Sequence, residues 1–230
     1  MGHAIVSGGA MASVPAVGIR LGDIAEGSIV KLNENGSPVE FYVAKHDYES
    51  ALNGAGRTLL VRKNCYDTRT WHSSDVNAYA SSTISTWLNN GYKNLHDISA
   101  QQAMNTSKFY YTPGNGSNRV TTLERSVFLL SIAELNKYTV SIGYANKEGS
   151  ALPIATVLQI AYNNGSSVTQ WTRSPQTNNN YSACFVSQNG DLGTWECSKS
   201  KVMMSRPCFT FPSGALFDEE TMLFSGKVAS

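Results

Sequence analysis

Hydrophobic and polar residues alternate along much of this chain, which is the pattern of strands with one buried face. The apolar run 29–32 precedes an alternating run over residues 39–43. Between them lie Asn35 and Gly36, a dipeptide typical of two-residue hairpin turns. We therefore predict a β-hairpin here, followed by a further buried strand within residues 57–66.

Apolar residues at helical spacing predict two short helices. Within residues 79–90, Ile84 and Trp87 fall on one face, and a serine precedes them as a cap. We expect Trp87 to pack into the core. Residues 153–163 show the same spacing, and Gly165 is expected to end that helix.

Extended segments dominate the rest of the chain. Residues 108–122 predict two extended pieces around a Pro-Gly-Asn-Gly loop. Residues 126–138 predict a buried strand that runs into a helical turn. Ser131 and Glu134 have the spacing of a capping box, which indicates where that turn starts.

The last third predicts strands after residue 165. Residues 168–174 alternate, and residues 181–197 predict a hairpin that turns at Asn189-Gly190. We expect the last strand of the fold to contain Arg206. The fold class is therefore α+β, with mainly antiparallel sheets, two short helices and long loops. The predicted divisions are an N-terminal arm over 1–20, one domain over 21–215 and a C-terminal tail over 216–230.

Composition narrows the classes of partner. Of the 230 residues, 41% are hydrophobic and only 15% are charged, and the net charge is +1. A protein that binds nucleic acid through phosphates would be more basic, so we expect no nucleic-acid partner. No apolar stretch approaches the ~20 residues of a membrane span, so we expect no membrane contact. The N-terminal stretch lacks the basic region and apolar core of a secretory signal.

Four cysteines are present: Cys65, Cys184, Cys197 and Cys208. None forms a C-x-x-C pair, so a zinc or redox site is not indicated. We expect buried free thiols, because disulfides are disfavoured in the cytosol. A Cys184–Cys197 disulfide closing the hairpin is the alternative.

The sequence shows few signs of catalysis. It holds no P-loop, no nucleophile elbow and no H-E-x-x-H motif. His46 lies beside Asp47, but neighbouring residues on a strand point to opposite faces. We expect no enzymatic activity, no catalytic residue, no cofactor and no metal, although a calcium site built from distant loops stays open.

The final third instead carries aromatic and amide side chains that are typical of adaptable contact surfaces. Trp171 lies on an alternating strand and is expected in the core, whereas Trp195 is either a core or a contact residue. The Asn run has poor helix and strand propensity, so we infer that it was not selected for local folding. The turn at Asn189-Gly190 should bring the two ends of its hairpin together. The predicted ligand-binding residues are Asn178, Asn179, Asn180, Tyr181, Trp195, Glu196 and Lys199.

Several spaced motifs, in one order, resemble a domain of unknown function common in Gram-positive gut bacteria and their prophages. They are a Ser-Ser-x-x-x-x-Trp-Leu-Asn helix, a Phe-Leu-Leu-Ser strand, a Trp-x-Arg-Ser strand and a closing Arg-Pro-x-Phe. The resemblance spans roughly residues 22 to 212. The motif residues here are Ser81, Ser82, Trp87, Leu88 and Asn89; residues 128–131; Trp171, Arg173 and Ser174; and Arg206, Pro207 and Phe209.

The Trp-x-Arg-Ser and Arg-Pro ending is similar to C-type-lectin-like domains, including the variable proteins of diversity-generating retroelements. This resemblance implies a C-type-lectin-like fold whose ligand face is formed by C-terminal strands and loops. The Glu-Pro-Asn and Trp-Asn-Asp sugar motifs are absent, as is a cysteine pair of the formylglycine-generating type. We expect Arg173 and Arg206 to be structural, because a planar guanidinium can hold several loop carbonyls at once.

The resemblance also implies a role on a phage particle. The expected function is a virion-associated tail protein, made in the host cytoplasm, that binds a host surface glycan or protein. We expect a homo-oligomer whose N-terminal arm contacts other virion proteins. A structural or decoration protein of the virion is the alternative, and a cell-wall-degrading enzyme would need a carboxylate pair assembled by the fold.

Overall fold

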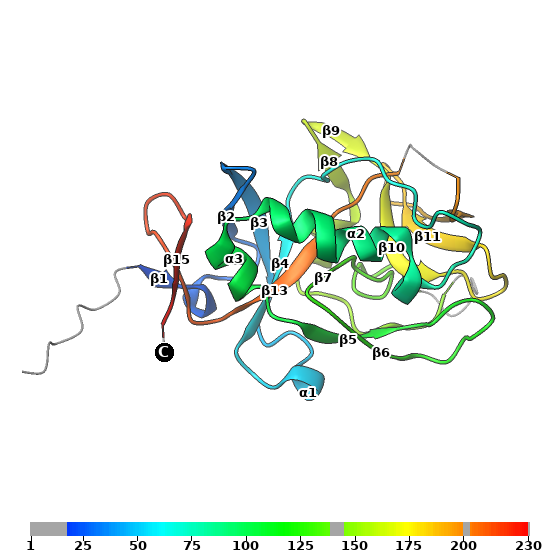
Figure 1. Ribbon diagram of the computed structural model, residues 1–230, viewed down its shortest axis with the longest axis horizontal. Helices are drawn as coiled ribbons and strands as arrows, with labels where there is room; N and C mark the ends of the chain where they lie inside the picture. The colour runs from blue at the N-terminus through cyan, green and yellow to red at the C-terminus, as the bar shows by residue number, and fades with distance from the viewer. Residues whose placement is uncertain (1–17, 139–144, 200–202, 230) are drawn as a thin grey trace, which may run out of the picture.

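A five-stranded antiparallel sheet forms the centre of the molecule in this computed structural model, which describes residues 18–138, 145–199 and 203–229 (Figure 1). Its strand order is β2-β3-β4-β13-β7. The predicted hairpin is confirmed, because β2 and β3 pair from Ile29–Tyr42 to Glu34–Ser37. The strand bounds are β2 (Ile29–Glu34), β3 (Ser37–Lys45), β4 (Arg57–Arg62), β7 (Val127–Phe128) and β13 (Cys208–Pro212).

The neighbouring inner strands β4 and β13 are buried on both faces. Leu59, Leu60 and Val61 of β4 are inaccessible to solvent, as are Phe209 and Phe211 of β13. Such continuous apolar runs have no polar face to present to water, so other elements must cover both sides of the sheet.

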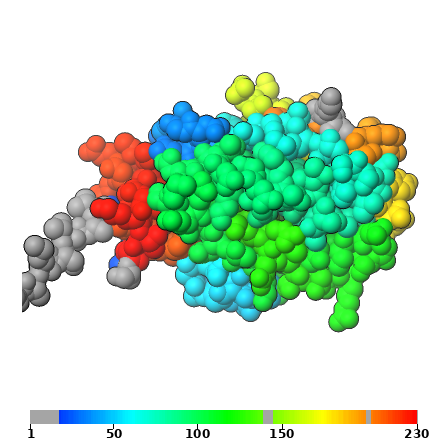
Figure 2. Space-filling model, viewed as in Figure 1, coloured from blue at the N-terminus to red at the C-terminus, as the bar shows by residue number. Residues whose placement is uncertain are grey.

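Helical segments cover one side, and Figure 2 shows them across the middle of the visible face. The predicted helix at 79–90 is confirmed as a composite of short turns. Its α-helical part begins where the Ser82 hydroxyl accepts a hydrogen bond from the Ser85 N–H at 3.1 Å. The segments are a 3-10 turn (Tyr79–Ser81), α2 (Thr83–Trp87), a π-helical turn (Leu88–Tyr92), a 3-10 turn (Lys93–Leu95) and α3 (Ile98–Ala103). The sequence analysis did not predict α3, nor α1 (Ser50–Asn53).

The second predicted helix, over 153–163, is wrong in its extent. Helix α4 covers only Ala155–Gln159, and β8 (Ala161–Asn163) then pairs with β9 (Ser166–Val168). Asn164 and Gly165 have φ of 49° and 82°, so they form the tight turn of a hairpin. Gly165 therefore turns a strand and does not end a helix.

The extended segments of the middle and last third are confirmed. β5 (Ser107–Tyr111) and β6 (Thr121–Arg125) form an antiparallel ribbon. β10 (Gln170–Pro175), β11 (Ser182–Val186) and β12 (Leu192–Glu196) form a second sheet in that order. At the start of the turn before α4, Ser131 and Glu134 exchange two hydrogen bonds, of 2.8 and 3.1 Å, as a capping box does.

The expectation that the last strand contains Arg206 is wrong. Arg206 precedes β13, and β14 (Ala215–Phe217) and β15 (Phe224–Val228) follow it. These two strands form a third sheet with β1 (Ile19–Arg20), which leads into a short 3-10 turn (Leu21–Asp23). The stretch predicted as a C-terminal tail thus contains strand residues, whereas residues 1–17 of the predicted arm lie outside the described residues.

The observed class is α+β with mainly antiparallel sheets, as predicted. All four cysteines are buried and none forms a disulfide, which confirms the prediction of thiols over a Cys184–Cys197 disulfide. In the hairpin, Cys184 lies opposite Thr194, so the alternative pairing is not supported by the register.

Candidate functional site

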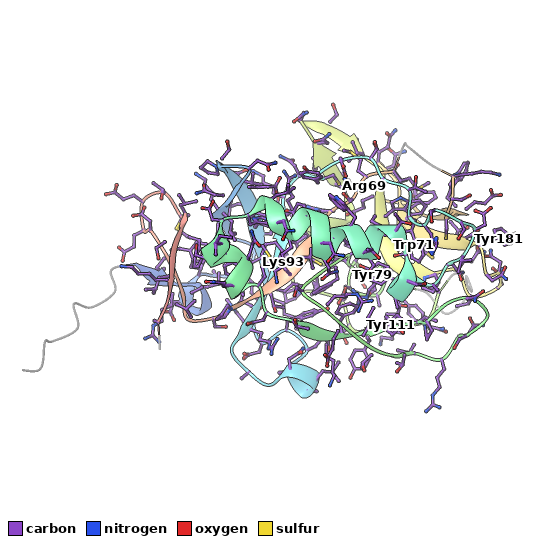
Figure 3. All side chains as sticks on the ribbon, viewed as in Figure 1. Arg69, Trp71, Tyr79, Lys93, Tyr111 and Tyr181 are labelled. Atoms are coloured by element: carbon purple, nitrogen blue, oxygen red, sulfur yellow. The ribbon has the colours of Figure 1, made fainter. Side chains whose placement is uncertain are left out.

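The sheet β10-β11-β12 lies at the end of the molecule opposite β1 and β15 (Figure 1). Figure 3 places Tyr181 at this extremity. The Cys197 N–H donates to the Tyr181 carbonyl at 2.8 Å, so the two open ends of the β11–β12 hairpin lie side by side, as predicted. Trp171 is buried in this sheet, whereas the side chains of Trp195 and Tyr181 are 48% and 45% exposed.

A polar hollow of about 470 Å³ lies beside these two aromatic residues. It brings together five of the seven predicted ligand-binding residues. The other two, Asn178 and Asn180, are exposed on the adjoining loop and do not line it. The lining residues are Gln176, Asn179, Tyr181, Ser182, Thr194, Trp195, Glu196 and Lys199.

The charges of this hollow are paired. The Lys199 ammonium group contacts the Glu196 carboxylate, and its hydrogen bond to that carboxylate raises the pKa of Lys199. Both side chains are substantially exposed, so the pair adds little to the stability of the fold. Each group can therefore turn to a ligand at small cost.

Asn179 shapes the loop above the hollow. Its carboxamide oxygen accepts hydrogen bonds from the N–H groups of Tyr181 and Ser182 at 3.0 and 2.8 Å. Its amide nitrogen donates to the Gln176 side chain at 2.6 Å. The inference that the Asn run was not selected for local folding is therefore wrong at Asn179, because this side chain satisfies backbone donors of its own loop.

The same loop is held from beneath by Asn77, which the sequence analysis did not single out. Asn77 is fully buried, and its amide nitrogen lies 3.0 Å from the carbonyl oxygens of Gln176, Asn179 and Ser182. Its carboxamide oxygen accepts from the Asn115 N–H at 2.7 Å. One side chain thus joins two loops that are distant in sequence and fixes the backbone behind the hollow.

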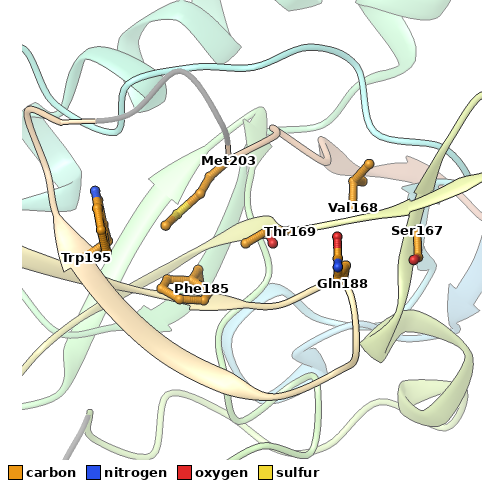
Figure 4. Close-up of a pocket in the computed structure, with 7 residues that line it drawn as sticks. All are labelled: Ser167, Val168, Thr169, Phe185, Gln188, Trp195 and Met203. Atoms are coloured by element: carbon orange, nitrogen blue, oxygen red, sulfur yellow. The ribbon is translucent and has the colours of Figure 1, made fainter.

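A second hollow, of about 350 Å³ and mainly apolar, also adjoins Trp195 (Figure 4). Trp195 lines both hollows. Opposite Gly193, the Phe185 ring lies where a Cβ would stand, at 2.3 Å, so only glycine allows this ring position. The residues lining the apolar hollow are Ser167, Val168, Thr169, Phe185, Gln188, Trp195 and Met203.

Residues 55–213 match the family described as Domain of unknown function (DUF6273). The chain belongs to the DUF6273 family. Neither a curated protein nor a solved structure matches the chain. Both hollows and the Asn77 clamp lie inside the matched region, so they are features of the DUF6273 domain itself.

Arg173 holds the interior of the DUF6273 domain. It is fully buried, its guanidinium group donates to both carboxylate oxygens of Glu134 at 2.6 and 3.0 Å, and it also donates to the carbonyls of Tyr110 and Leu129. The Glu134 charge keeps the pKa of Arg173 above its usual value against the opposing effect of burial. This is a clamp of the kind that the sequence analysis expected, with a carboxylate added.

Arg206 clamps carbonyl oxygens alone. It donates to the backbone carbonyls of Arg62, Lys63 and Leu158 at 2.8, 2.9 and 3.0 Å. Burial lowers its pKa. The three carbonyls come from two segments that are distant in sequence, so Arg206 ties the chain just before β13 to the end of β4 and to α4.

Trp87 is half-buried against the core. Its ring packs on Tyr66 and Tyr92, and the Arg69 guanidinium group lies 3.3 Å from its centre. Trp87 therefore packs at the edge of the core, and the Arg69 cation lies over its ring.

Two carboxyl groups, those of Glu134 and Glu148, are buried, and both are engaged in hydrogen bonds. Glu148 accepts from the Thr112 N–H and the Ser174 hydroxyl at 2.6 and 2.5 Å, and burial raises its pKa. Glu134 accepts from Tyr48 as well as from Arg173. Both carboxyl groups are inaccessible to solvent, so neither faces a substrate.

The other candidate catalytic residue, His46, is also held by hydrogen bonds within the fold. Both ring nitrogens of His46 make hydrogen bonds of 2.9 Å, to Thr58 and to the Ile24 carbonyl. Within residues 18–138, 145–199 and 203–229, no cluster of three or more His, Cys, Asp or Glu is arranged to hold a metal ion. In the same residues, no helix is long and apolar enough to cross a membrane.

Proposed function

We propose that this DUF6273 protein binds a ligand on another surface through the end of its β10-β11-β12 sheet. The observation that carries the proposal is the pair of exposed aromatic residues, Trp195 and Tyr181, that line a polar hollow. Large aromatic side chains on a surface are the residues that contribute most to binding energy in many interfaces.

The backbone behind this surface supports the proposal. Asn77 and Asn179 hold the loop through hydrogen bonds to its own carbonyl and N–H groups. A loop that is ordered before binding loses less conformational entropy when a ligand arrives, so the affinity is higher.

The biological setting that we propose follows from the motif resemblance. The protein has a C-type-lectin-like fold, is carried on a phage virion as a tail component, and attaches to a host surface glycan or protein. It assembles as a homo-oligomer, and its N-terminal arm contacts other virion proteins. The Trp-x-Arg-Ser and Arg-Pro motifs support this setting through the resemblance that they carry. Arg173 lies in β10 of the same sheet and ties it to the carbonyls of Tyr110 and Leu129.

A binding screen tests the proposal. Fluorescently labelled full-length protein is incubated with a panel of intact Gram-positive bacterial cells and with an array of cell-wall glycans. We expect saturable binding to a subset, lost in the double variant Trp195→Ala, Tyr181→Ala and kept by Ile98→Ala. Ile98 is a suitable control because it is 66% exposed and lies on α3, away from the hollows. Binding that the double variant retains in full would refute the proposed surface.

A further inference from the structure

Strand β12 forms one edge of its sheet, because the strand order is β10-β11-β12. The backbone hydrogen bonds at the two ends of its pairing with β11 show which backbone groups of β12 face away from β11. The Ser187 N–H donates to the Asp191 carbonyl at 2.8 Å, and the Cys197 N–H donates to the Tyr181 carbonyl at 2.8 Å. Bonded and non-bonded pairs alternate in an antiparallel ladder, so the even-numbered residues of β12 direct their backbone groups away from β11.

These outward residues are Leu192, Thr194 and Glu196. The Glu196 carbonyl accepts a turn hydrogen bond from the Lys199 N–H at 3.2 Å. Among the described residues, no strand or isolated bridge pairs with the outer side of β12. The N–H and C=O groups of Leu192 and Thr194, with the Glu196 N–H, therefore form a row available to another chain.

Three other sheet edges of this molecule are covered or carry lysine. On β2, the Lys31 N–H donates to the Met222 carbonyl at 2.7 Å. On β10, the Trp171 N–H donates to the Met204 carbonyl at 3.0 Å, and β15 carries Lys227. Covered edges and lysine residues are the usual protection against pairing with another chain. β12 has the sequence Leu-Gly-Thr-Trp-Glu, without lysine or proline, and exposes a tryptophan.

The two hollows adjoin β12. Gly193 and Trp195 share one face of the sheet with Phe185 of β11, and Phe185 and Trp195 line the apolar hollow. Thr194 and Glu196 lie on the opposite face and line the polar hollow, to which Trp195 also contributes. Successive side chains of a strand point to opposite faces, so a strand paired with β12 would direct its side chains alternately to these two faces.

We propose that β12 binds an extended peptide segment of a partner protein by strand addition. Backbone hydrogen bonds to the outward groups of Leu192 and Thr194 hold the segment. An apolar side chain enters the hollow beside Phe185, and the neighbouring hydroxyl or amide side chain enters the polar hollow. This inference rests on the proposed function, because it identifies the ligand of the same surface as a peptide in place of a glycan.

The test begins with selection from a random library of nine-residue linear peptides displayed on their mRNA, against the full-length protein. We expect enriched peptides in which apolar and polar residues alternate. Replacing the backbone N–H groups of an enriched peptide that face β12 by N-methyl groups, tested in both alternating sets, should weaken its binding at least ~10-fold for one set, because pairing requires these groups. Failure to enrich any peptide, or equal binding by the N-methylated form, would overturn strand addition.

A variant of the protein tests the same contact from the other side. Thr194→Pro removes one outward N–H, and Pro is tolerated at a sheet edge where that group faces solvent. Thr194→Val removes the same hydroxyl and keeps the backbone group, so the difference between the two variants isolates the N–H. Peptide affinity should be at least ~10-fold lower in Thr194→Pro than in Thr194→Val.

The two proposals fail in different ways. If Thr194→Pro, folded by circular dichroism, binds cells and peptides as the parent does while Trp195→Ala does not, the binding surface stands and strand addition is wrong. Glycan-array binding that needs Trp195 but not the Thr194 N–H would likewise support the surface and refute strand addition. If neither variant changes binding to cells, the proposed surface itself is wrong.

Discussion

Removal of the Asn77 side chain should destabilise the protein, because this side chain is fully buried and holds two loops by hydrogen bonds. Asn77→Ala deletes contacts with the carbonyls of Gln176, Asn179 and Ser182 and with the Asn115 N–H. The two N–H bonds of the amide nitrogen can donate about two hydrogen bonds at once to the three carbonyls. With the one that the carboxamide oxygen accepts, the loss amounts to about three hydrogen bonds. At about 1 kcal/mol each, the free energy of unfolding should fall by about 3 kcal/mol.

Urea denaturation followed by circular dichroism measures this change. Asn178→Ala is the matched control, because Asn178 is exposed on the same loop and should change stability by less than about 0.5 kcal/mol. A loss below about 1 kcal/mol for Asn77→Ala would show that the loop does not depend on this side chain, and the argument for an ordered binding surface would fail.

Three further predictions concern stability. Trp87→Ala should lower the free energy of unfolding by about 2–3 kcal/mol in chemical denaturation, less than a fully buried aromatic, because the ring is half-buried beneath Arg69; a loss under about 1 kcal/mol would contradict this packing. Gly193→Ala should cost about 1–3 kcal/mol in thermal unfolding, because the new Cβ meets the Phe185 ring, and Phe185→Leu in the same chain should restore part of it; an unchanged melting temperature would contradict this. Burial lowers the pKa of His96 in the folded protein to about 4, whereas in the unfolded chain this histidine has its usual pKa of about 6.5 and takes up a proton below that pH. The free energy of unfolding should therefore be unaffected by His96 above pH 6.5 and should fall by up to about 3 kcal/mol between pH 6.5 and 4. A His96→Phe variant should show a flatter pH profile of stability, and a slope equal to that of the parent would refute the assignment.

The strand pattern of this fold could be predicted from the sequence because its signals are local. Asn35-Gly36 and Asn189-Gly190 mark hairpins whose flanking residues alternate, and the register follows from the turn. The same dipeptide at Asn164-Gly165 is predicted to end a helix, because the apolar spacing of residues 153–161 matches a helix. Here the turn chemistry prevails over the helical pattern, and α4 ends at Gln159.

The candidate site could be predicted in part. Exposed aromatics and a Lys-Glu pair near the hairpin ends could be inferred because the turn brings these ends together. Asn77 could not be inferred, since its partners lie 99 to 105 residues away and a buried asparagine has no distinguishing local pattern. The position of the apolar hollow also depends on Met203 and Val168, which only the folded chain brings to Phe185.

The dissociation constant of the Trp195→Ala variant for a bound cell type, relative to that of the parent, tests the central claim most directly. The variant removes a side chain that is 48% exposed and lines both hollows, so the fold should persist. We predict a dissociation constant at least ~30-fold higher, which corresponds to a hot-spot loss of about 2 kcal/mol. Ile98→Ala should bind as the parent does. A Trp195→Ala variant that is folded and binds with the affinity of the parent would contradict the claim that this surface is the binding site.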